Sequence, residues 1–189
     1  VMEGADIHAY VLPRPLPTPV LAYAIRHLGC AAGVMVTASH NPPQDNGYKV
    51  YLGDGTQIVP PADTDICAAI EAVGPVSGVP RGDGWTTLGE DVLDSYLRSC
   101  AALVPEDAPR EVRLAYTPMH GVGESCCAEA MRRAGFGRVN VLASQRDPNG
   151  DFPTVPGHVA NPEIPKTLEL AIDEARATGA DLVLASDPD

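Results

Sequence analysis

The feature that most constrains the fold is a strict alternation of apolar and amphipathic segments in the second half of the chain. Residues 112–116, 138–143 and 181–185 are short and apolar, as strands are, and the two segments between them have helical periodicity. Helices of that length provide the crossovers that parallel strands need. Residues 112–185 therefore predict a largely parallel sheet packed between helices, an α/β fold.

The first part of the chain is predicted to be α/β as well. A helix is expected to begin with Thr18 as its cap and Pro19 in its first turn, and to stop at Gly29. The apolar run at residues 33–36 is expected to be a buried strand, and residues 48–52 a second strand. Together the two parts predict mixed, largely parallel sheets packed between helices.

Two more helices are expected at residues 61–73 and 90–104. Charge and two prolines make residues 105–110 the best linker, which predicts domains at residues 1–106 and 107–189. The chain has no initiator methionine and ends abruptly, so we expect it to be a piece of a longer polypeptide. The side chains predicted to face inward on these two helices are Ile66, Ala69, Ile70 and Val73, and Val92, Leu93, Tyr96, Leu97, Cys100 and Leu103.

The charge balance excludes some classes of partner. A formal net charge of −12 repels nucleic acid and anionic membranes, so we expect neither as a partner. The same charge opposes an anionic sugar phosphate, so any phosphate site must be locally cationic or assisted by a metal. The cysteines show no CxxC pair and no zinc spacing, which favours reduced structural thiols in the cytoplasm. They are Cys30, Cys67, Cys100, Cys126 and Cys127.

A serine loop is the first candidate for chemistry. Ser39 and His40 directly follow the strand at residues 33–36, where rigid scaffolds present loops to ligands. Lys49 is one of only two lysines and lies on the strand that returns past this loop. A serine oxygen can carry phosphate when donors surround its ester, and an ammonium group can move a proton. Alternatively, Ser39 and Asn41 only satisfy turn hydrogen bonds.

The second candidate is an acidic pair at the carboxyl end of the last strand. Asp187 and Asp189 are two residues apart on a tight loop, so both carboxylates can bind one cation. Magnesium prefers such hard oxygen ligands and commonly shares them with a phosphate. The alternative is a solvated acidic chain end.

The serine loop resembles the active-site signature of the α-D-phosphohexomutases. The resemblance rests on Thr-Ala-Ser-His-Asn-Pro at residues 37–42 and Asn-Gly-Tyr-Lys-Val-Tyr at residues 46–51. The continuation Gly-Asp-Gly-Thr-Gln-Ile at residues 53–58 favours the phosphoglucomutase/phosphopentomutase branch, which includes bacterial phosphomannomutases. The resemblance covers nearly the whole chain and implies two incomplete domains of this fold. Leu-Pro-Thr-Pro at residues 16–19 is similar to a structural segment of the family.

The resemblance also implies an activity. Ser39 would be the phosphorylated residue, with His40 and Lys49 around the transferred group. The family binds Mg²⁺ through a D-x-D-x-D-R loop and a phosphoserine oxygen, which implies Ser39, Asp187 and Asp189 as metal ligands. The resemblance implies that the third aspartate and the arginine of that loop would lie beyond Asp189. The implied substrates are glucose, mannose or pentose phosphates, converted through a sugar bisphosphate.

Two rival functions remain at this stage. Asp187 and Asp189 could be the nucleophile and the acid/base of a haloacid-dehalogenase-type phosphatase. The chain could also be a non-catalytic fragment that binds phosphosugars, because it alone would lack much of the family's cleft. Finally, Gly121 and Gly123 before a helix could cradle a phosphate, but we expect them to serve tight packing.

Overall fold

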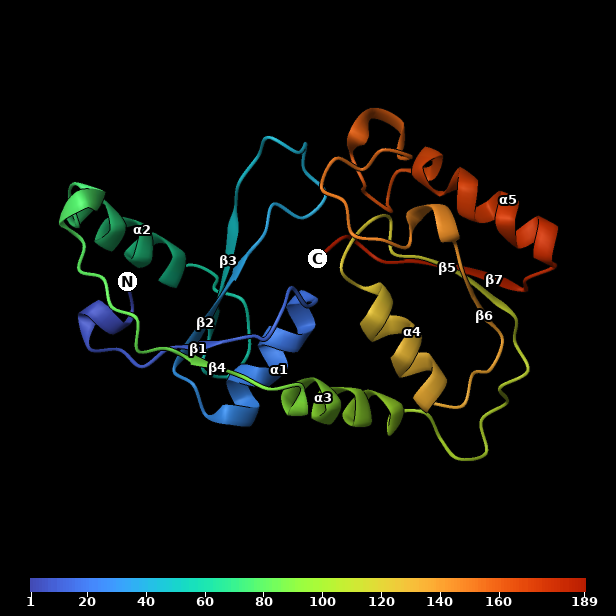
Figure 1. Ribbon diagram of the computed structural model, residues 1–189, viewed down its shortest axis with the longest axis horizontal. Helices are drawn as coiled ribbons and strands as arrows, with labels where there is room; N and C mark the ends of the chain where they lie inside the picture. The colour runs from blue at the N-terminus through green and yellow to red at the C-terminus, as the bar shows by residue number, and fades with distance from the viewer.

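The structure is a computed structural model that describes residues 1–189. It contains five α-helices and seven β-strands (Figure 1). In chain order they are β1 (Tyr10–Val11), α1 (Thr18–Leu28), β2 (Ala32–Val36), β3 (Tyr48–Leu52), α2 (Ala62–Ala72), β4 (Thr86–Thr87), α3 (Asp91–Ala101), β5 (Leu114–Thr117), α4 (Glu124–Arg133), β6 (Val139–Val141), α5 (Glu169–Thr178) and β7 (Leu182–Ala185). Short 3-10 helices span Glu3–Ala5, Val76–Gly78, Ala143–Gln145, Pro156–His158 and Pro165–Leu168.

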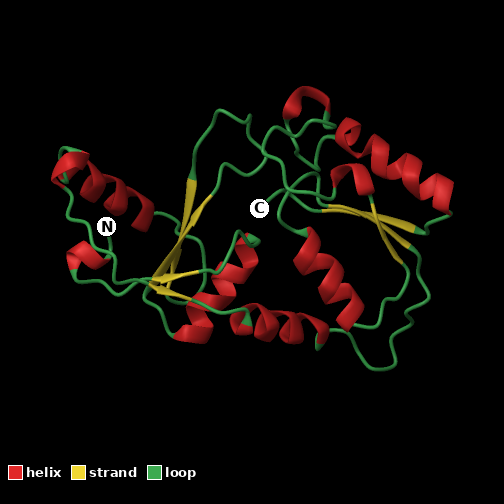
Figure 2. Cartoon of the chain, in the orientation of Figure 1, coloured by secondary structure: helices red, strands yellow, loops and turns green.

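Residues 107–189, here called the C-terminal half, form a parallel sheet in the order β6-β5-β7. Leu114 of the central strand β5 pairs with Val139 on one side and with Leu182 on the other. Helices α4 and α5 lie on opposite sides of this sheet (Figure 2). The parallel sheet predicted from the alternating pattern is therefore confirmed.

Residues 1–106, the N-terminal half, contain two separate two-stranded sheets. Strands β2 and β3 form an antiparallel pair in which Met35 faces Lys49 across the ladder. Strands β1 and β4 form a short parallel pair. The molecule as a whole thus has mixed, largely parallel sheets with helices around them, as the sequence predicts.

A hydrophobic cluster joins the two halves. It consists of Leu16 just before α1, Val20 from α1, Leu93 and Leu97 from α3, and Cys126 from α4. Helix α3 runs beneath both halves and packs beside α4 (Figure 1). This packing brings the end of the chain close to the β2–β3 loop, as Figure 1 also shows.

Several burial predictions in the N-terminal half are wrong. Strand β2 is not buried, since Val34 is 44% exposed and Val36 is 81% exposed. Helix α2 buries no residue, and Ile70 and Val73 face solvent. Leu103 is exposed because α3 ends at Ala101. Apolar spacing defines a helix face, but burial requires a neighbouring element, and α2 makes no extensive contact with another helix or strand.

None of the helices combines the length and the apolar character that crossing a lipid bilayer requires.

Candidate active site

The Ser39 loop connects β2 to β3 and is closed at its base by backbone contacts. The Thr37 N–H donates to the Gly47 carbonyl at 3.0 Å, and the Ser39 N–H donates to Thr37 Oγ1 at 2.8 Å. A Cβ at Gly47 would lie 2.7 Å from the backbone carbonyl oxygen of Thr37, so only glycine allows the two strands to approach this closely here. Ser39 itself has a φ of +54°, a conformation that L-residues rarely adopt. The loop therefore holds the serine in one strained orientation.

The acidic loop follows β7 and is held by the loop that follows β5. The Val122 N–H donates to the Pro188 carbonyl at 2.8 Å. A Cβ on Gly121 would collide with the Pro188 backbone, and one on Gly123 would lie 2.8 Å from the Tyr116 hydroxyl. The tight packing predicted for both glycines is confirmed. Two adjacent parallel strands thus fix the acidic loop at their carboxyl ends, where open α/β sheets usually bind ligands.

The five residues selected from the sequence come together between the two halves. Ser39 Oγ lies 2.5 Å from Asp187 Oδ1 and 2.7 Å from Asp189 Oδ1, and its single proton can be donated to either carboxylate. His40 Nδ1 lies 2.6 Å from Asp187 Oδ2, and Lys49 Nζ donates to Asp189 Oδ2 at 2.7 Å. The hydroxyl is therefore enclosed by two carboxylates, which are themselves paired with an imidazole and an ammonium group.

Sequence reasoning missed a sixth residue, Thr18. Its predicted role as a helix cap is wrong, because the cap of α1 is Pro17 and no side chain caps the helix. Instead, Thr18 Oγ1 donates to Asp189 Oδ2 at 3.1 Å. A hydroxyl between two prolines is the available signal, but a threonine at the start of a helix usually caps it, which favours the structural interpretation.

Asp189 is the most enclosed charged group of the site, with a side chain that is 11% exposed. Burial alone would raise the pKa of its carboxyl. Hydrogen bonds from Lys49 and Ser39, together with the charge of Lys49, outweigh burial and lower this pKa to about 2. Asp189 is therefore an anion at neutral pH.

The side-chain oxygens at this site are suitable ligands for a hard cation. Two carboxylates and a serine oxygen meet within hydrogen-bonding distance, and oxygen is the ligand that Mg²⁺ prefers. The structure has no group of three or more His, Cys, Asp or Glu side chains arranged to hold a metal ion. The residues present thus fit a shared site, in which further oxygens would have to come from a bound phosphate.

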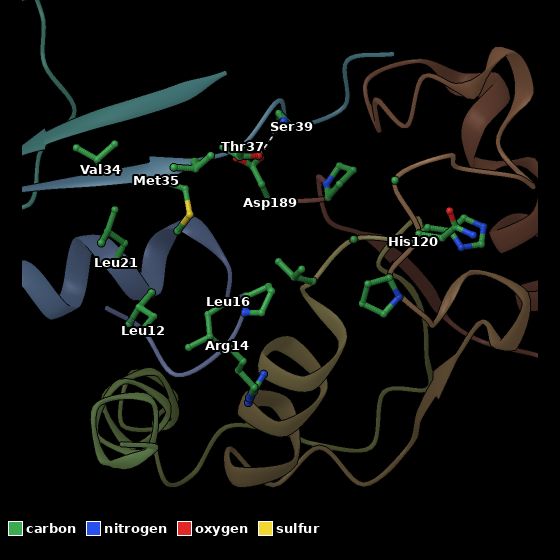
Figure 3. A pocket seen from close by; sticks show the side chains of 18 of the residues that line it. Leu12, Arg14, Leu16, Leu21, Val34, Met35, Thr37, Ser39, His120 and Asp189 are labelled. Atoms are coloured by element: carbon green, nitrogen blue, oxygen red, sulfur yellow. Dashed lines mark hydrogen bonds between the residues drawn. The ribbon is translucent and has the colours of Figure 1, made fainter. Parts of the chain in front are cut away.

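A cleft of about 760 Å³ opens beside Ser39 and Asp189. Figure 3 shows both residues on one wall, with Leu12, Leu21 and Val34 on the apolar side. His120 lies on the far side of the cleft in Figure 3, and its Nε2 is 3.0 Å from Thr154 Oγ1. The cleft is large enough for a phosphorylated sugar.

Known proteins resemble this chain along its whole length. The family model described as phosphoglucomutase/phosphomannomutase, alpha/beta/alpha domain I, matches residues 1–76, and the model for domain II matches residues 94–189. A Haemophilus influenzae protein named "Probable phosphomannomutase" is 48% identical over 194 residues, which cover 100% of this chain and 39% of that protein.

Two further relatives agree with these matches. The phosphopentomutase of Homo sapiens is 35% identical over 201 residues, covering 97% of this chain and 31% of that protein. A crystal structure of a Thermus thermophilus protein has a TM-score of 0.76 and 28% identity, covering 98% of this chain and 40% of that one. The chain thus spans between about a third and two fifths of the length of these relatives.

Proposed function

We propose, because the chain belongs to the phosphoglucomutase/phosphomannomutase family, that the complete gene product is a phosphosugar mutase. It would move phosphate between two hydroxyls of a hexose or pentose through a sugar bisphosphate. The observation that carries this proposal is the position of Ser39 Oγ, between Asp187 and Asp189 and beside the cleft.

Each of the three catalytic candidates has a distinct part in this reaction. Ser39 would carry the phosphate: its O–P bond breaks as a bond forms from phosphorus to a sugar hydroxyl, and the second phosphate later returns to Ser39. Lys49 would accept the hydroxyl proton as a neutral amine, and the ammonium formed in this way would offset negative charge on the transferred group. His40, paired with Asp187, would donate a hydrogen bond to the same group.

We assign Mg²⁺ binding to Ser39, Asp187 and Asp189. Magnesium bound there would neutralise charge on the transferred phosphoryl group. The present contact between Ser39 and both carboxylates supports this assignment, because phosphorylated Ser39 would face two anions at close range. A bound Mg²⁺ would also offset the net charge of −12, which by itself disfavours the binding of an anionic substrate.

The proposed substrates are glucose, mannose or pentose phosphates and their bisphosphates, in keeping with the names of the relatives. We propose a domain boundary between residues 106 and 107, although the second family match begins earlier, within α3. Five free cysteines and sugar-phosphate substrates favour the cytoplasm as the place of action.

The two rival functions are not favoured. In a haloacid-dehalogenase-type phosphatase, Asp187 would attack phosphorus directly, yet here Asp187 Oδ1 lies 2.5 Å from the Ser39 hydroxyl. A fragment that only binds phosphosugars would have no need for a strained serine between paired carboxylates. Both family matches agree with the mutase.

The test is Ser39→Ala in the complete gene product. Turnover of glucose, mannose and ribose 1-phosphates, each with its bisphosphate present, should fall by at least about a thousandfold. Ser144→Ala changes an exposed serine and is the matched control. Mass spectrometry should find phosphate on residue 39 of the wild type only. Turnover that survives unchanged in Ser39→Ala would refute the mutase proposal.

A further inference from the structure

We infer that Thr18 is a positioning residue that orients the Asp189 carboxylate toward Ser39, an inference that rests on the proposed function. The observation is the bond from Thr18 Oγ1 to Asp189 Oδ2 at 3.1 Å. No other hydrogen bond of the Thr18 hydroxyl occurs in the structure, so the group does not cap or brace its own helix.

The backbone around Thr18 is built to hold that hydroxyl in place. Pro17 precedes it in an extended conformation, with φ −59° and ψ 146°, and Pro19 follows it in the first turn of α1. Both rings fix φ and reduce the freedom of the segment. Leu16 and Val20, which flank the segment, are buried in the cluster that joins the two halves. Thr18 itself is 8% exposed, and its β-branched side chain has few rotamers.

The two oxygens of Asp189 have different partners as a result. Oδ2 accepts from both Thr18 and Lys49, whereas Oδ1 lies 2.7 Å from the Ser39 hydroxyl. Two donors at one oxygen fix the rotation of the carboxylate about its last bond, which a single flexible lysine does less well. Oδ1 is thereby kept facing the serine, where a cation or a phosphoryl oxygen would meet it.

Helix α1 also contributes its own field. The first N–H groups of a helix have no partner within the helix, and they give its start a partial positive charge. Because Thr18 is the first residue of α1, this positive end lies next to the Asp189 carboxylate. The helix end and the hydroxyl therefore both favour the anionic form of the Asp189 carboxylate. Figure 3 shows Asp189 reaching from its own loop toward Thr37 and Ser39.

The test compares three variants in the complete gene product. Thr18→Val keeps the shape and removes the donor, Thr18→Ser keeps the donor, and Thr64→Val changes an exposed threonine near the start of α2. We use Mn²⁺ as the probe for the metal site and measure its affinity by electron paramagnetic resonance, together with kcat, KM and the thermal unfolding midpoint.

Loss of one hydrogen bond to a charged group should lower kcat and Mn²⁺ affinity each by about tenfold in Thr18→Val. KM for the sugar phosphate should change by less than about twofold, because Thr18 does not contact substrate. Thr18→Ser should recover most of both losses, and Thr64→Val should match the wild type. If Thr18→Val does not unfold cooperatively, Thr18→Ala replaces it in the same comparison.

Unchanged kcat and Mn²⁺ affinity in the folded Thr18→Val protein would overturn the inference. So would equal losses in Thr18→Ser and Thr18→Val, because packing of the methyl group would then be responsible. The Ser39→Ala assay separates this result from a failure of the mutase proposal. If Ser39→Ala keeps turnover, the proposed function is wrong, while Mn²⁺ affinity still reports on Thr18.

Discussion

The two halves of the molecule contribute to the same site from very different packing environments. In the C-terminal half, all four residues of β5 are buried, and its loop clamps the acidic pair against Gly121. In the N-terminal half, α2 buries nothing and β2 is half exposed, yet this half supplies Ser39, His40 and Lys49. The carboxylates of Asp187 and Asp189 are thus positioned by a packed core, whereas Ser39, His40 and Lys49 lie on the half-exposed β2–β3 hairpin.

This difference means that the site is also part of the contact between the halves. The bonds from Thr18, Ser39 and Lys49 to Asp189 all cross from one half to the other. The contacts of Ser39 and Lys49 with Asp189 therefore hold the tip of the β2–β3 hairpin against the acidic loop. Changes in the C-terminal half should act on folding, and changes in the N-terminal hairpin should act mainly on local geometry.

The largest expected contrast is between two tyrosines. Tyr116 of β5 is 1% exposed and its hydroxyl lies 2.9 Å from Ser186 Oγ, whereas Tyr48 of β3 is 58% exposed. Tyr116→Ala should lower the free energy of unfolding by about 3–5 kcal/mol, as other large core truncations do. Tyr48→Ala should lower it by less than about 0.5 kcal/mol. Urea unfolding measures both, and equal losses would show that the halves do not differ as described.

A second contrast concerns the clamp on the acidic loop. Gly121→Ala would place a methyl group against the Pro188 backbone, which cannot move aside cheaply. We expect a loss of about 1–3 kcal/mol from overpacking, with a shift of Asp187 and Asp189 that weakens Mn²⁺ binding. Gly137→Ala meets no atom within 4 Å and is the matched control. Calorimetry and metal titration test this pair, and equal behaviour of the two variants would argue against the clamp.

The structure of the C-terminal half is also the one that the sequence predicts better. Alternating apolar and amphipathic segments imply a parallel sheet, because few other folds satisfy that order of elements. The strand after Arg113 and the loop at Asp187 lie where that order predicts them. Burial in the N-terminal half does not follow the prediction, since the periodicity of Ile70 and Val73 says nothing about which element covers them.

The residues of the candidate site also differ in how well the sequence predicts them. Ser39, His40, Lys49 and the acidic pair could be selected from the sequence because their residue types and spacing match a known signature. Thr18 was missed because its partner, Asp189, is 171 positions away in the sequence, and no local pattern reports such a contact. The packing of α1 and α3 against α4 brings the two together.

The smallest expected effect lies at the surface of the C-terminal half, where Arg113 and Asp181 form an exposed ion pair at 2.7 Å. Hydrogen bonds from the Arg113 side chain and backbone lower the pKa of Asp181 to about 2, from an ordinary value of 3.8. The folded-state pKa is depressed, so the pair stabilises the fold above about pH 4, and this contribution is lost as the pH falls toward about 2.

Asp181→Asn should therefore lower the urea midpoint only slightly at about pH 6, because solvent screens exposed pairs, and by less at about pH 2, where Asp181 is about half protonated in the folded state. Arg113→Gln tests the same pair from its other side and should show the same pH dependence. An effect of Asp181→Asn that is undiminished at about pH 2 would assign it to the backbone bond from the Arg113 N–H rather than to charge. The Arg113 N–H lies directly before β5, so this result would also show that a hydrogen bond at the surface of the C-terminal half stabilises its sheet.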